Sequence, residues 1–108
     1  MVFQELVSDV DEENCEDLLC KDFAILNFFS DWKMGCLMCM PVIESLAEEL
    51  LDKVCFGKVN IDEQENLAER YKVSKVPEML IFQKGKLIER MDCSMPEEAL
   101  RERLAAFF

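Results

Sequence analysis

The chain contains no histidine, and this absence removes several classes of enzyme. Without an imidazole there is no Ser-His-Asp triad, no Cys-His nucleophile pair, no histidine-ligated zinc and no histidine base working near neutral pH. Reactive chemistry would have to come from thiols, carboxylates or lysines.

Glycine and proline are scarce, at three residues each among 108. With 51% hydrophobic and 32% charged residues, the composition is that of a folded domain and excludes a disordered, collagen-like or low-complexity chain. No break in composition divides the sequence, so we expect residues 1–108 to form one domain.

Positive charge is also in short supply. Twelve lysines and arginines face 23 aspartates and glutamates, a net charge of −11, and so acidic a surface repels phosphate backbones and anionic lipids. We therefore expect neither a nucleic-acid nor a membrane partner. Met1–Leu6 lacks the basic and apolar regions of a signal peptide, and no apolar run is long enough to cross a bilayer, so we expect a cytoplasmic protein.

Cysteine, in contrast, is abundant. The six cysteines are Cys15, Cys20, Cys36, Cys39, Cys55 and Cys93. In the cytoplasm thiols stay reduced, and cysteine pairs there are more often catalytic or metal-binding than structural.

The hydrophobic pattern predicts strands alternating with helices. Phe23–Phe29 is almost entirely apolar, as in a strand covered on both faces, and an amphipathic helix containing Pro41 follows Trp32. The other predicted elements are a first strand within 2–7, a helix at 12–20, a strand at 53–62, a helix at 63–71, a hairpin of 78–82 and 87–91, and a helix from Pro96 whose apolar face includes Phe107 and Phe108. This βαβαβαββα order predicts a mixed sheet between two helical layers.

The strongest candidate site lies where the Phe23–Phe29 strand meets the next helix. Cys36 and Cys39 stand near the start of that helix, where the helix dipole and free N–H groups favour a thiolate. Side chains three residues apart on a regular helix have Cβ atoms about 5 to 6 Å apart, against about 3.5 to 4.5 Å in a disulfide. Pairing would therefore need some local adjustment of the helix.

Several segments together resemble the thioredoxin family over essentially the whole chain. They are Phe23–Phe29 followed by Trp32, the helix with Pro41, Lys58-Val59-Asn60-Ile61-Asp62, the Val76-Pro77 step, the hairpin at Gly85 and the amphipathic last helix. The resemblance implies an α/β thioredoxin fold, with a mixed five-stranded sheet flanked by four helices. It also implies a cis peptide before Pro77 that faces the active-site cysteines, and thiol–disulfide exchange with protein substrates.

The sequence departs from the family pattern at the site. In an ungapped alignment Lys33 takes the place of the family's attacking cysteine and Cys36 that of the resolving one, while Cys39 lies one turn further along the helix. The other departures are Asn27 in place of a buried aspartate, Glu78 in place of a common threonine and Cys93 in place of a glycine.

Two interpretations of the cysteines remain open. In the first, the loop after Trp32 is effectively longer, Cys36 is an exposed nucleophile helped by Lys33, and Cys39 resolves the mixed disulfide. In the second, Cys36 alone survives at a family position, Cys39 is a core residue, and the protein binds a partner peptide without dithiol exchange. A third hypothesis is a Cu(I) site, because Met34 to Cys39 matches a Met-x-Cys-x-x-Cys pattern.

We adopt the first interpretation as the working hypothesis: a protein disulfide reductase that uses Cys36 and Cys39. The substrate would lie beside Trp32, Lys33, Val76 and Pro77, with Cys93 as a candidate regulatory thiol. No cofactor is expected beyond a Cys36–Cys39 disulfide. The expected partners are protein disulfides and a reductant of the thioredoxin-reductase type, and we expect a monomer.

Overall fold

The computed structural model describes residues 6–108 and contains five strands and four helices in that range. In chain order they are β1 (Val7–Asp9), α1 (Cys15–Leu19), β2 (Phe23–Phe29), α2 (Met34–Glu49), β3 (Cys55–Asn60), α3 (Glu65–Arg70), β4 (Glu78–Gln83), β5 (Lys86–Asp92) and α4 (Glu97–Ala105). The predicted order of elements is therefore confirmed.

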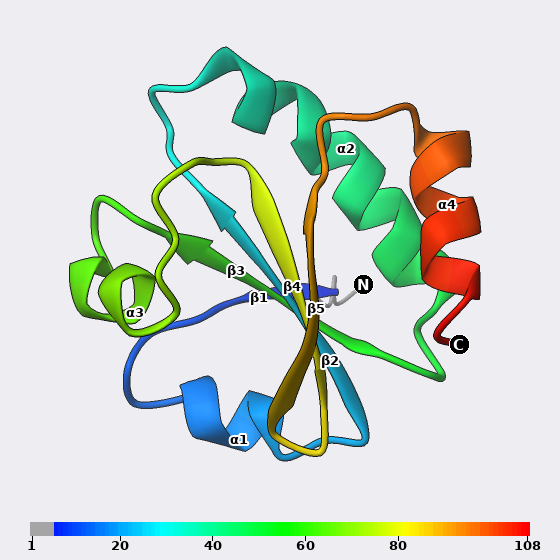
Figure 1. Ribbon diagram of the computed structural model, residues 1–108, viewed down its shortest axis with the longest axis horizontal. Coiled ribbons are helices and arrows are strands. Elements are labelled where there is room, and N and C mark those ends of the chain that lie inside the picture. Colours follow the sequence, from blue (N-terminus) through cyan, green and yellow to red (C-terminus); the bar gives the residue numbers. More distant parts are fainter. Residues whose placement is uncertain (1–5) are drawn as a thin grey trace, which may run out of the picture.

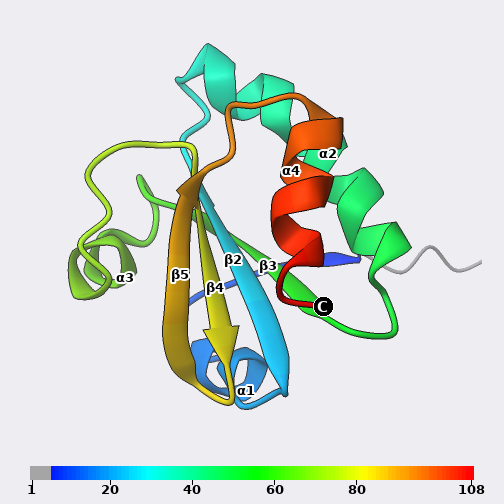
Figure 2. The same cartoon turned by 45° about the vertical axis from the view of Figure 1, so that its right-hand side comes forward.

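The strands form one mixed sheet in the order β1-β3-β2-β4-β5. Strands β1 and β2 run parallel to β3, whereas β4 is antiparallel to both β2 and β5. Figures 1 and 2 show α2 and α4 together on one side of this sheet, with α1 and α3 away from that pair. The expected sheet between two helical layers is what the structure has.

A separate hydrophobic core lies on each face of the sheet. On the side of α2 and α4, Ile25 packs with helix residues such as Ile43 and Leu100. On the other side, Leu26 and Phe28 pack with residues of α1 and α3, including Leu67. Successive side chains of a strand point to opposite faces, so a strand that contributes to both cores must be apolar at nearly every position, as β2 is apart from Asn27.

The boundaries of several elements differ from the prediction. Helix α1 begins only at Cys15, because the N–H groups of Glu13 and Asn14 bond to the Asp11 side chain in a turn. The first strand extends to Asp9, two residues beyond its predicted end at Val7, and the part of that prediction at 2–5 lies outside the described residues. Phe108 lies beyond the end of α4, where its ring packs edge-on against Phe23.

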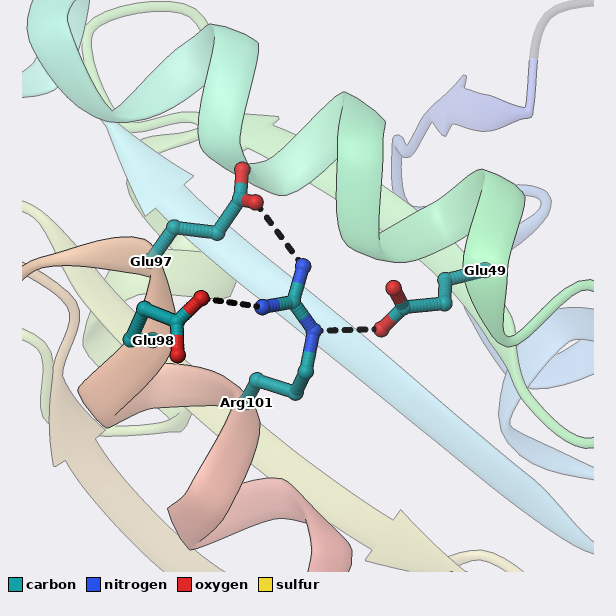
Figure 3. A network of polar contacts seen from close by, with 4 residues as sticks. All are labelled: Glu49, Glu97, Glu98 and Arg101. Atoms are coloured by element: carbon teal, nitrogen blue, oxygen red, sulfur yellow. Dashed lines mark hydrogen bonds and ion pairs between the residues drawn. The ribbon is translucent and has the colours of Figure 1, made fainter.

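Helix α4 is joined to α2 by a charged cluster around Arg101 (Figure 3). The guanidinium donates to Glu49 of α2 at 2.8 Å, and to Glu97 and Glu98 of its own helix at 2.8 and 3.4 Å. These carboxylates, Glu49 first, raise the pKa of Arg101. Because these side chains are largely solvent-exposed and exposed ion pairs are weak, the cluster contributes little to the stability of the fold.

Gly57 of β3 allows close packing of Val10 and Leu18 against the sheet. A Cβ atom there would lie 2.5 Å from Cγ2 of Val10 and 2.6 Å from Cδ2 of Leu18. We predict that Gly57→Ala lowers the free energy of unfolding by about 1 to 3 kcal/mol, the usual cost of overpacking a core, as measured by urea denaturation. Gly35→Ala is the matched control, because its nearest neighbour would be Pro77 Cδ at 3.6 Å. A Gly57→Ala protein as stable as the control would contradict this packing.

Candidate functional site

Three elements converge where β2 ends. Phe28 is paired with Glu78 at the start of β4, and Glu78 with Asp92 at the end of β5. The chain that leaves β2 turns into the start of α2, and Cys93 follows β5 directly. Figure 1 shows these ends meeting at one edge of the sheet. Residues far apart in the sequence are thus gathered around the first turns of α2.

The surface of this site is apolar and carries a single lysine from α2. Lys33 is the N-cap of α2 and lies exposed, and the neighbouring Trp32 is 88% exposed. Met34, Leu37 and Met38 are also exposed, and Met38 reaches 72%. These five residues are called the Trp32 surface below. Large exposed apolar side chains gathered in one place are typical of a binding surface.

Cys36 lies beneath this surface and is only 1% exposed, so the expectation of an exposed nucleophile is wrong for this structure. Helix α2 begins at Met34, and from there the helical repeat turns Cys36 inward. Its sulfur accepts a hydrogen bond from the Ser30 N–H at 3.4 Å. Burial raises the pKa of the Cys36 thiol, and the Ser30 N–H and Lys33 offset only part of this effect.

Cys39 lies one turn deeper and is also buried. Its thiol donates to the backbone carbonyl of Cys93 at 3.0 Å, and the Cys93 thiol donates to Oδ1 of Asn27 at 3.5 Å. The Asn27 amide in turn donates to the sulfur of Met40 at 3.7 Å. The structure therefore brings Cys93 into contact with Cys39, as part of a buried chain of sulfur and amide groups.

The Val76–Pro77 peptide is cis, and Pro77 packs beside the start of α2, as the resemblance implied. Pro77 is buried and Val76 half-buried. Beyond Pro77 lies a hollow of about 300 Å³, whose lining includes Lys75, Glu78 and Arg90. Glu78 Oε1 lies 3.2 Å from Arg90 Nη1, an ion pair without hydrogen-bond geometry.

The remaining cysteines lie away from this site, and all six, each within the described residues, are free thiols. Cys15 is buried and Cys55 half-buried, whereas Cys20 is exposed. Within residues 6–108, no three cysteine or carboxylate side chains are placed to hold a metal ion together. None of the helices described is long and apolar enough to span a bilayer.

The sequence pattern did not predict two features of the site, which involve Ser30 and Arg90. Ser30 is buried, bonds to Asp62 at 2.7 Å and presents its N–H to Cys36. Arg90 pairs with Glu78 across neighbouring strands. A serine that directly follows the apolar strand, two residues before Trp32, is a usable signal for the first feature, whereas the second depends on the pairing of β4 with β5.

Burial raises the pKa of four acidic groups, Cys15, Cys36, Tyr71 and Cys93. Each keeps its proton to a higher pH in the folded protein than in the unfolded chain, where a thiol titrates near 9.0. Above that pH the unfolded chain binds fewer protons, so rising pH favours unfolding. We predict that the free energy of unfolding under reducing conditions falls above about pH 9, by at most about 1.4 kcal/mol per pH unit for each group.

Urea titrations between about pH 7 and pH 10 measure this slope. Cys93→Ala should reduce it, whereas Cys20→Ala, which removes an exposed thiol, should leave it unchanged. A stability that stays constant or increases over this range would contradict the burial of these groups.

Comparison with known proteins gives a consistent result. The thioredoxin family model matches residues 6–106. A thioredoxin of Chlamydia trachomatis serovar D is 39% identical over 85 residues, which cover 79% of this chain and 82% of the relative. A thioredoxin of Chlamydia pneumoniae is 35% identical over 86 residues, covering 80% and 83%.

A solved thioredoxin structure has the same fold as this chain. It is a point mutant of a thioredoxin from Halobacterium salinarum NRC-1, which superposes with a TM-score of 0.86 at 26% identity and covers 99% of this chain and 96% of its own. The order of elements, the cis peptide at Pro77 and the sequence matches point to one conclusion: this chain belongs to the thioredoxin family.

Proposed function

We propose that this protein binds extended segments of partner proteins on the Trp32 surface and beside Val76, without rapid dithiol exchange. Membership of the thioredoxin family supports a function of the thiol–disulfide oxidoreductase type in general, on protein partners. The six free thiols are consistent with a reducing, cytoplasmic setting.

The observation that carries this proposal is the exposed position of Lys33 at the N-cap of α2, above two buried cysteines. Attack on a protein disulfide needs a thiolate that can reach a sulfur of the partner. At the position of the family's attacking cysteine this chain has Lys33, and the ammonium group of a lysine cannot form a mixed disulfide. The thiol nearest to Lys33 in the sequence, that of Cys36, is 1% exposed.

The surroundings of Lys33 favour a bound polypeptide. Trp32, Met34 and Met38 offer apolar side chains, and methionine adapts its shape to different partners. Neither the N–H nor the C=O of Val76 has a backbone partner among the described residues. An extended segment could therefore pair with Val76 as a strand does and place its side chains on the apolar surface.

Exchange through Cys36 and Cys39 is the second candidate, and one contact favours it. The Ser30 N–H lies 3.4 Å from the Cys36 sulfur within the first turn of α2, an arrangement that stabilises a thiolate. Cys36 would attack the partner disulfide, and Cys39 would then attack Cys36 and release the partner as a thiol. The first turn of α2 would have to open before either step.

Insulin reduction by dithiothreitol distinguishes the two candidates. For wild type, Cys36→Ser and Cys39→Ser, we predict rates equal to the background with dithiothreitol alone. For Lys33→Cys we predict a rate at least about tenfold higher, because it places an exposed thiol three residues before Cys36.

The double variant Lys33→Cys with Cys36→Ser is the control and should lose this gain. Wild-type activity above background that disappears in both Cys36→Ser and Cys39→Ser would overturn the proposal in favour of the second candidate.

Partner binding can be followed with Trp32, which is the only tryptophan of the chain. We predict that insulin B chain with alkylated cysteines produces a saturable blue shift of its fluorescence, because the exposed indole becomes covered. Met38→Glu should weaken this binding about tenfold or more by placing a charge in the apolar surface.

Leu51→Glu is the matched control, since Leu51 is 58% exposed but follows the far end of α2. No shift in the wild type, or equal affinities of the two variants, would contradict binding at this surface.

A further inference from the structure

Three of the buried thiols lie close to the carboxyl end of β2, and their geometry distinguishes which two can join. Cys36 and Cys39 are the third and sixth residues of α2, inside a continuous helix. Cβ atoms at that spacing are about 5 to 6 Å apart, too far for a disulfide, which needs about 3.5 to 4.5 Å. A Cys36–Cys39 bond would therefore require part of α2 to unwind.

Cys39 lies in α2 and Cys93 in the segment that follows β5, and the two residues are in contact. The Cys39 sulfur lies 3.0 Å from the carbonyl oxygen of Cys93, and both residues belong to the core on the α2 side of the sheet. The pKa of the Cys93 thiol is raised, first by burial and then by the adjacent Cys39 thiol. The two sulfurs are thus neighbours, and no helix would have to unwind to join them.

We propose that Cys39 and Cys93 form a disulfide when the protein meets hydrogen peroxide, and that this pair, not Cys36 with Cys39, is the redox-active dithiol of the chain. Peroxide is small enough to reach a thiol that a protein disulfide cannot. The inference does not use the proposed binding of partner proteins.

The reaction balances with peroxide as the oxidant. The Cys39 thiolate attacks one peroxide oxygen, the O–O bond breaks, and Cys39 becomes a sulfenic acid as the first water leaves. The Cys93 sulfur then attacks the Cys39 sulfur, the S–O bond breaks and the second water leaves. Two thiols lose two electrons and two protons, and one peroxide becomes two waters.

The bond would connect α2 to the segment between β5 and α4. That segment also contains Ser94, whose Oγ lies close to Gly35, as does Cδ of Pro77. Oxidation would therefore tie together the elements that carry the exposed surface of the site. A thiol reductant would reverse it and restore both thiols.

The test is a disulfide map of the full chain after treatment with hydrogen peroxide and alkylation of the remaining thiols. Trypsin releases Met34–Lys53, with Cys36 and Cys39, and Met91–Arg101, with Cys93. We expect these two peptides to be joined, with a loss of two hydrogens and with recovery of the separate peptides after dithiothreitol. A Cys36–Cys39 bond would leave them separate, so the outcomes differ directly by mass.

Serine variants of the three cysteines identify which two sulfurs form the bond. The joined peptide should persist in Cys36→Ser and vanish in both Cys39→Ser and Cys93→Ser, with circular dichroism to confirm that each variant is folded. The proposal is overturned by an internal Cys36–Cys39 bond in the wild type, by a joined peptide that needs Cys36, or by separate peptides in which Cys39 is oxidised without a partner.

Discussion

The register of α2 is the constraint on which the site depends. Because the helix begins at Met34, its 3.6-residue repeat turns Cys36 and Cys39 onto the same face as Ile43 and Leu46. That face packs against the sheet, and all four residues are buried. The same repeat leaves Met34, Leu37 and Met38 outside, with Lys33 at the cap. The residue at which α2 begins therefore determines which of its side chains are exposed and which are buried in the core.

The position of α2 also determines the surroundings of Asn27 in the sheet. Asn27 shares the α2-facing side of β2 with Ile25, two residues away, and is a buried polar residue in a strand of apolar ones. The hydrogen-bond partners of its side chain are sulfur atoms: Met40 accepts from the amide N–H, and the Cys93 thiol donates to the amide oxygen. A buried carboxylate could accept protons from nearby thiols, whereas an amide cannot. The site therefore combines a lysine at the surface with buried thiols below it.

Much of this architecture could be predicted from the sequence because it depends on local patterns. Phe23–Phe29 is predicted to the residue, since both of its faces are buried and no polar position interrupts the run other than Asn27. The turn around Gly85 is equally direct, because its φ of 84° suits glycine. The start of α1 was missed because the N–H groups of Glu13 and Asn14 donate to the Asp11 side chain, and these hydrogen bonds compete with the helix.

The site was predicted less well, for a physical reason. The spacing of Cys36, Cys39, Ile43 and Leu46 already indicates a shared helical face, and it disfavours the longer loop that would expose Cys36. The contact of Cys39 with Cys93 joins residues 54 positions apart, and only the folded sheet brings them together. Local periodicity predicts which face a residue occupies, but not its partner on that face.

The most direct test of the buried thiols is native-state alkylation of the reduced protein, followed residue by residue with mass spectrometry. Cys20 is exposed and serves as the internal reference. We predict that iodoacetamide modifies Cys20 first, and that Cys36 and Cys39 react at least about a hundredfold more slowly, because their alkylation requires local opening of the protein. Modification of Cys36 as fast as that of Cys20 would contradict it.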